Sequence, residues 1–95
     1  MTALTLETIV VRNADDVAET DYEDKIVLLH IENGEYYNFN DTGSDLWRAL
    51  SSPKKVGELV DLIVSLYECT AEQCTPDVHK WLNDTMSKGL VTISL

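Results

Sequence analysis

The chain is poor in positive charge: seven lysines and arginines stand against 17 aspartates and glutamates, for a net charge of −10. A protein this acidic repels phosphate backbones and anionic lipid headgroups at long range. The sequence also has no apolar run approaching the roughly 18 residues that a membrane-spanning helix needs. These two absences argue against a nucleic-acid partner and against a membrane partner.

Cysteine is scarce as well, with only Cys69 and Cys74. A disulfide between them requires the intervening segment to loop back. The N-terminus, Met1 to Leu4, has no basic region followed by an apolar core, so we expect no signal peptide and a cytoplasmic location, where both thiols would be reduced. His79 does not complete a zinc pattern with the two cysteines, because they are not a Cys-x₂₋₄-Cys pair. No metal site is expected.

Catalytic motifs are also missing. There is no nucleophile elbow, no phosphate-binding glycine loop and no His-Glu-x-x-His. His30 alternates within a strand and is predicted to be a surface or edge residue, and His79 is predicted to be solvated near the start of a helix. We expect no enzyme, no catalytic residue and no cofactor.

What the sequence does contain is one small hydrophobic core. With 95 residues and 44% hydrophobic content, residues 1–95 are predicted to form a single domain. Alternation predicts a first strand over 5–12. The segment 13–24 then carries six carboxylates and no lysine or arginine. It is predicted to be a solvated loop or, alternatively, a surface that steers a basic partner.

The next segment has the pattern of a β-hairpin. Strand-like stretches over 26–32 and 35–40 flank Asn33-Gly34, which predicts a two-residue type I′ turn because both residues tolerate positive φ. Alternation then places Phe39 on the core-facing side together with Tyr37, and Tyr36 and Asn38 on the other side.

The second hairpin strand has no proline or lysine that would prevent pairing with another chain. Two alternatives remain open from the pattern alone. Either the first or the last strand of the domain covers this edge, or a peptide adds to it as a further strand.

Helical spacing follows the hairpin. Helices are predicted over 42–51 and 56–67, and a third begins with Thr75 as N-cap and Pro76 at the first helical position and ends at Lys88. A short last strand is expected over 90–95. The order is similar to a winged helix-turn-helix, but Asp77 and Asp84 offset the lysines of the third helix, so a DNA-binding face is not expected.

At this point the residues match a known family. The matching series is Gly34-x-Tyr36-Tyr37-x-Phe39-Asn40-x-Thr42-Gly43-x-x-Leu46-Trp47-x-x-Leu50, Pro53, Val56-x-Glu58-Leu59-Val60, Tyr67, Cys74-x-x-Asp77-Val78-x-x-Trp81-Leu82 and Lys88-Gly89-Leu90-Val91. Over about residues 25–93 the chain resembles the PqqD-like family, the small recognition elements for leader peptides of ribosomally made, post-translationally modified peptides (RiPPs). It most resembles the free-standing members from lasso-peptide biosynthesis.

The resemblance implies an α+β, winged helix-turn-helix-like fold: a three-stranded antiparallel sheet packed on three helices, with a short C-terminal strand. It also implies a function. The domain would bind the leader of a precursor peptide as an added β-strand and present it to a leader peptidase and then a cyclase.

Carried onto this chain, the leader would lie on 35–40 and against the third helix. The residues expected to contact it are Glu35, Tyr36, Tyr37, Asn38, Phe39, Val78, His79, Trp81, Leu82 and Thr85. The alternative place for Trp81, Leu82 and Met86 is the core, because an apolar helical stripe usually packs there. Phe39, His79 and Thr85 depart from residues common in the family, which affects the expected specificity more than the fold. The alternative is a structural or regulatory winged-helix domain that homodimerises through its edge strand, so a monomer and an edge-strand dimer are both open.

Overall fold

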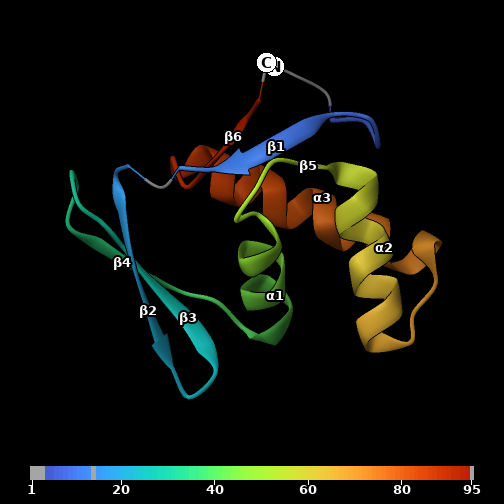
Figure 1. Ribbon diagram of the computed structural model, residues 1–95, viewed down its shortest axis with the longest axis horizontal. Coiled ribbons are helices and arrows are strands. Elements are labelled where there is room, and N and C mark those ends of the chain that lie inside the picture. The colour runs from blue at the N-terminus through green and yellow to red at the C-terminus, as the bar shows by residue number, and fades with distance from the viewer. Residues whose placement is uncertain (1–3, 14, 95) are drawn as a thin grey trace.

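The computed structural model describes residues 4–13 and 15–94. This part of the chain forms a mixed α+β fold with antiparallel sheets and three helices (Figure 1). In chain order the elements are β1 (Ile9–Arg12), β2 (Val17–Tyr22), β3 (Lys25–His30), β4 (Glu35–Asn38), α1 (Asp41–Ala49), β5 (Lys54–Lys55), α2 (Val56–Tyr67), α3 (Ala71–Ser87) and β6 (Val91–Ile93). Met1, Thr2 and Ala3, on which the signal-peptide expectation rests, and Leu95 of the predicted last strand lie outside the described residues.

Two three-stranded antiparallel sheets organise the fold, in the orders β2-β3-β4 and β5-β1-β6. The predicted first strand is shorter than expected, and it pairs with β5 and β6 instead of the hairpin. The hairpin's third strand is β2, which lies in the acidic segment predicted to be a loop. The loop prediction was wrong. Strand β2 is exposed except at Val17, so its sequence lacks the apolar alternation from which a strand is predicted.

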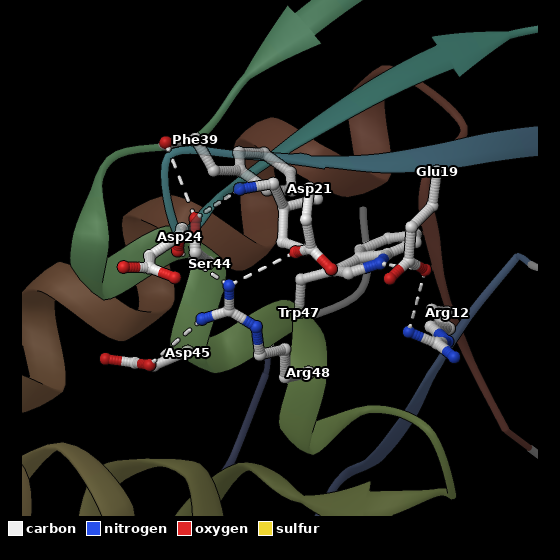
Figure 2. Close-up of polar contacts among 10 residues, drawn as sticks. Arg12, Glu19, Asp21, Asp24, Phe39, Ser44, Asp45, Trp47 and Arg48 are labelled. Atoms are coloured by element: carbon white, nitrogen blue, oxygen red, sulfur yellow. Dashed lines mark hydrogen bonds and ion pairs between the residues drawn. The ribbon is translucent and has the colours of Figure 1, made fainter.

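The type I′ geometry expected at Asn33-Gly34 occurs between β2 and β3 instead. Glu23 and Asp24 have φ of 50° and 68°, and Tyr22 pairs directly with Lys25. Positive φ is unfavourable for residues that carry a Cβ. The Nη2 of Arg48 donates to the carbonyl of Asp24 at 2.6 Å, which fastens this strained turn to α1 (Figure 2).

The connection between β3 and β4 is a four-residue loop, 31–34, because His30 pairs with Glu35. Gly34 has a φ of 71°, whereas Asn33 is not among the residues with positive φ. Instead, the Oδ1 of Asn33 accepts a hydrogen bond from the amide of Glu35 at 2.9 Å. The predicted two-residue turn was therefore wrong, since asparagine acts here through its side chain.

Helix α1 is tied closely to the hairpin. Asn40 caps it by accepting a hydrogen bond from the amide of Gly43 at 2.8 Å. The hydroxyl of Ser44 accepts from the amide of Ile26 at 2.9 Å and donates to the carbonyl of Phe39 at 3.5 Å (Figure 2). This hydroxyl bridges β3 and the chain beyond β4 at the point where the strand pairing ends.

Helix α2 has the predicted bounds, but α3 begins at Ala71 instead of Pro76. Thr70 and Gln73 form a reciprocal capping box, each accepting a hydrogen bond from the other's amide at 3.2 Å. Pro76 therefore lies inside the helix. Thr75 is not the N-cap, and its hydroxyl donates to the carbonyl of Ala71 at 2.7 Å.

Cys69 and Cys74 form a disulfide across the connection between α2 and α3. The expectation of two reduced thiols was wrong because the segment does loop back: the capped turn at Thr70 brings the two Cα atoms within 6.6 Å, a separation that a disulfide spans. The bond ties the end of α2 to the first turn of α3.

The core lies where the hairpin sheet and β1 meet the helices. Its largest fully buried side chains include Trp47, Ile26, Leu28, Leu46, Leu50, Leu59 and Leu82. His30 is also buried, so its predicted surface position was wrong: it continues the alternation of Ile26 and Leu28 on the helix-facing side of β3. Within residues 4–13 and 15–94, no helix has the length and apolar character needed to cross a membrane.

Candidate functional site

Strand β4 is an edge strand that pairs, among the described strands, only with β3. The alternative in which the first or last strand covers this edge is excluded, because β1 and β6 pair with one another in the second sheet. The amide of Phe39 donates to the carbonyl of Ile26 at 3.0 Å, and main-chain groups alternate in direction along an antiparallel strand. The N–H and C=O groups of Tyr36 and Asn38 therefore point to the open side.

A groove of about 460 Å³ lies between this edge and α3. Its lining residues come from β4, from the chain after it, and from one face of α3: Tyr36, Tyr37, Asn38, Phe39, Asn40, Trp81, Asp84, Thr85 and Lys88. A second hollow of about 280 Å³, between α1 and α3, shares Asn40, Trp81 and Asp84 with it. The two hollows meet at Trp81, so the groove extends past the end of β4 toward the start of α1.

Three aromatic side chains connect this groove to the core. The Phe39 ring centre lies 6.0 Å from that of Trp47 and 5.5 Å from that of Trp81, both in tilted arrangements. Trp47 is buried, whereas Phe39 and Trp81 are half-buried. The predicted inward position of Phe39 is confirmed, and this stack holds Trp81 at the groove.

Gly43 gives Trp81 the room for this position. A Cβ at Gly43 would lie 2.9 Å from the Trp81 Nε1, so a larger residue would push the indole away. The same indole N–H is buried and has no hydrogen-bond partner among the described residues.

The face of α3 that lines the groove differs from the predicted one. Val78 and Leu82 are 1% and 0% exposed, so they are core residues, and their predicted place on the groove wall was wrong. Thr85 is also buried but does line the groove, with its hydroxyl donating to the carbonyl of Trp81 at 2.9 Å. The apolar stripe used for the prediction is the stripe that packs into the core.

Sequence reasoning missed Asn40, Asp84 and Lys88 as groove residues. The signal was available in the spacing, because 81, 84, 85 and 88 follow the i, i+3, i+4, i+7 pattern of a single helix face. His79, by contrast, is half-buried, and the structure does not bring it to the groove. Its Nε2 is buried without a partner among the described residues.

Tyr37 contacts two charged residues, Lys88, which lines the groove, and Glu35, which was predicted to contact the leader but does not line it. The Tyr37 hydroxyl donates to the Glu35 carboxylate at 2.8 Å. This hydrogen bond is the main reason that the pKa of Tyr37 is raised above its usual value of 10.0, and desolvation is a smaller one. The Lys88 ammonium lies over the ring of the same tyrosine. Tyr37 is thus held from both sides, by β4 and by the end of α3.

The opposite edge of the sheet, β2, is anchored by its acidic side chains. Figure 2 shows the Glu19 carboxylate accepting from the indole Nε1 of Trp47, at 3.0 Å, and pairing with Arg12, at 3.3 Å. Asp21 pairs with Arg48 at 3.3 Å. Charged side chains of this kind discourage a further strand from pairing. The sheet therefore has one guarded edge and one open edge.

Nothing in the described ranges resembles a metal centre, since no group of three or more histidine, cysteine, aspartate or glutamate residues is placed to hold an ion. The site's resources are main-chain hydrogen-bonding groups, aromatic surface and a few charges. Such a surface binds an extended chain.

Comparison with known proteins bears directly on this site. The sequence model of the family described as "Coenzyme PQQ synthesis protein D (PqqD)" matches residues 25–91. A search of curated proteins finds no match. One similar solved structure is that of TbiB1 in complex with the TbiA(beta) leader peptide. The identity is 29%, the TM-score is 0.76, and the match covers 82% of this chain and 91% of that one.

Two more distant structures share the fold. A lasso peptide synthetase B1 complexed with the leader peptide has 18% identity and a TM-score of 0.77, with 87% of this chain and 96% of that chain covered. The PqqD truncation of Methylobacterium extorquens PqqCD, described as a functional and stand-alone RiPP recognition element, has 16% identity and a TM-score of 0.76, with 96% of each chain covered.

Proposed function

The chain belongs to the PqqD family, and from this membership we propose that it binds the leader segment of a ribosomally made precursor peptide in RiPP biosynthesis. The observation that carries the proposal is the open edge of β4 facing a groove walled by α3. The relative with 29% identity, whose structure was solved with a leader peptide, supports the same function.

The leader would bind by β-strand addition. The outward N–H and C=O groups of Tyr36 and Asn38 would pair with its main chain, which gives affinity without regard to sequence. The half-buried rings of Phe39 and Trp81 would contact its apolar side chains, and the carboxylate of Asp84 would favour basic ones. The buried indole N–H of Trp81 has no partner among the described residues. It would donate a hydrogen bond to the leader if binding moves the atoms that bury it.

The proposal extends to the pathway. The domain, winged helix-turn-helix-like in its helices and C-terminal strand, would act in the cytoplasm without catalysing a reaction. It would present the leader to a separate leader peptidase and then to a cyclase, in a lasso-peptide or related pathway. The family membership and the leader-peptide complexes among its structural relatives support this assignment.

Titration of a fluorescently labelled leader peptide tests the function. Asn38→Pro removes an amide that faces the open side and leaves the pairing with β3 intact, so it should weaken binding while circular dichroism stays unchanged. Asp21→Pro is the matched control: it removes the corresponding amide from the guarded edge, and leader affinity should not change.

The assignment fails if the wild-type domain binds no leader from its own pathway more tightly than about 100 µM, a weak limit for specific recognition. It also fails if both proline variants bind as the wild type does, because the edge would then not be used. The open edge of β4 is equally consistent with the alternative function, homodimerisation through this strand. A dimer that Asn38→Pro dissolves and that a leader peptide does not dissociate would support an edge-strand homodimer instead.

A further inference from the structure

The sheet β2-β3-β4 has a second face that the leader groove does not use. Figure 1 shows the three helices on one side of this sheet and none on the other. Since side chains alternate along a strand, the residues opposite the buried Ile26 and Leu28 point away from the helices. The outer face carries the apolar residues Ala18, Tyr22, Val27, Leu29 and Tyr36 together with the polar residues Thr20, Lys25 and Asn38, and the exposed Ile31 follows β3 in the adjoining loop.

This outer face is unusually apolar for a solvent-facing surface. Tyr22, Ile31 and Tyr36 are 65%, 59% and 69% exposed. Register brings Ala18, Leu29 and Tyr36 side by side across the three strands, and Val27 lies next to this apolar row, between Thr20 and Asn38. Contiguous apolar patches on soluble domains mark interaction sites.

Charge surrounds this patch. Glu23 and Asp24 lie in the turn at one end of β3, and Glu32 lies in the loop at the other end. Lys25, opposite Tyr22 on the outer face, is the one cation on the described strands of this sheet, and the whole chain carries −10. A second copy of the chain would bring the same carboxylates against these. The complementary surface is apolar at its centre and basic at its rim.

The patch also borders the groove through Tyr36. The main chain of Tyr36 faces the open edge, whereas its side chain stands on the outer face. A strand added at β4 would therefore widen the outer face by one strand. A protein seated there would touch the recognition domain and its bound leader together.

We propose that the outer face of this sheet is the docking surface for the leader-cleaving peptidase, which would meet it with an apolar patch rimmed by lysine and arginine. The inference rests on the proposed function. It gives the exposed apolar residues of the sheet and the carboxylates around them a common role: they place the protease beside the strand that it must reach.

The test measures two affinities on the same variants, with the purified peptidase of the pathway and the labelled leader as probes. The double variant Tyr22→Ser, Ile31→Ser should weaken peptidase binding by about tenfold or more, as expected when interface anchors are lost. Leader affinity should stay within about twofold of the wild type, because neither residue lines the groove. Leu66→Ser, which removes a 53% exposed apolar residue from α2, is the matched control and should change neither affinity.

The outcomes separate the two proposals. Wild-type leader binding with undiminished peptidase binding by the double variant would overturn the docking surface alone. No leader binding by any form would overturn the proposed function instead. A concentration-dependent dimer that the double variant abolishes would assign the face to self-association and would also overturn the proposal.

Discussion

The ammonium of Lys88 lies 5.4 Å from the centre of the Tyr37 ring, joining the end of α3 to β4 across one end of the groove. A cation over an aromatic face contributes about 0.5–1 kcal/mol at an exposed site. Both residues line the groove, so we expect an incoming strand to displace this contact.

Lys88→Met should therefore speed leader association by roughly two- to fivefold, the factor that corresponds to losing a contact of about 0.5–1 kcal/mol. Stopped-flow fluorescence with labelled leader measures this rate. Lys54→Met is the charge-matched control, since Lys54 lies on β5 and does not line the groove. Slower association in Lys88→Met than in Lys54→Met would mean that the ammonium attracts the leader instead of blocking it.

Glu19→Ala should destabilise the domain by about 1–3 kcal/mol, because it leaves the buried indole N–H of Trp47 without its acceptor. The same change removes the partner of Arg12, whose guanidinium lies 5.3 Å from the Trp47 ring centre. Urea unfolding followed by tryptophan fluorescence measures the loss.

Asp21→Ala is the comparison for that experiment. It removes a carboxylate from the same strand, but the pair it breaks with Arg48 is largely exposed and should contribute below about 1 kcal/mol. Equal losses in the two variants would show that the bond to Trp47 is not what anchors β2.

Asp24→Gly should stabilise the fold by roughly 1 kcal/mol, because glycine adopts the φ of 68° without the strain that a Cβ brings. The carbonyl that accepts from Arg48 is kept. Thermal unfolding checks the prediction, with Glu32→Gly as control: Glu32 has no positive φ, so glycine there should bring no gain.

Replacing Cys69 and Cys74 by serine should lower the free energy of unfolding by about 2 kcal/mol, the chain-entropy value for a loop this short. Neither cysteine lines the groove, so leader affinity should change by less than about twofold. Wild type in a reducing agent should match the serine variant. A reducing agent without effect on the wild type would contradict the disulfide's contribution.

Patterns with a strong periodic component were predicted well. Helix α2 has the predicted bounds, and its core residues Val56, Leu59, Val60 and Ile63 follow the predicted helical period. The alternation predicted for residues 36–39 also holds, with Tyr37 and Phe39 half-buried and Tyr36 and Asn38 exposed. The start of α3 was missed because the capping box at Thr70 outweighs the start signal of Thr75 and Pro76.

The acidic strand and the groove wall were missed for opposite reasons. Strand β2 is exposed along almost its whole length, so no periodic signal exists. Helix α3 carries two stripes with helical spacing. The apolar stripe of Val78 and Leu82 packs into the core, and it hid the mixed stripe of Trp81 and Lys88, which lines the groove. The open edge itself depends on which strands pair with each other, and local sequence does not determine that.

The hydroxyl of Ser44 bridges Ile26 and Phe39 where β4 ends. It thereby limits the length over which a peptide can pair with this strand. Only Tyr36 and Asn38 face outward before that point, so a partner strand finds at most four main-chain groups. At about 0.5–1.5 kcal/mol each, they give about 2–6 kcal/mol. Micromolar affinity needs about 8 kcal/mol. Contacts with side chains beyond the end of β4 must supply the remaining binding free energy. A short docking strand therefore makes recognition depend on the side chains of the peptide and not only on its extended main chain.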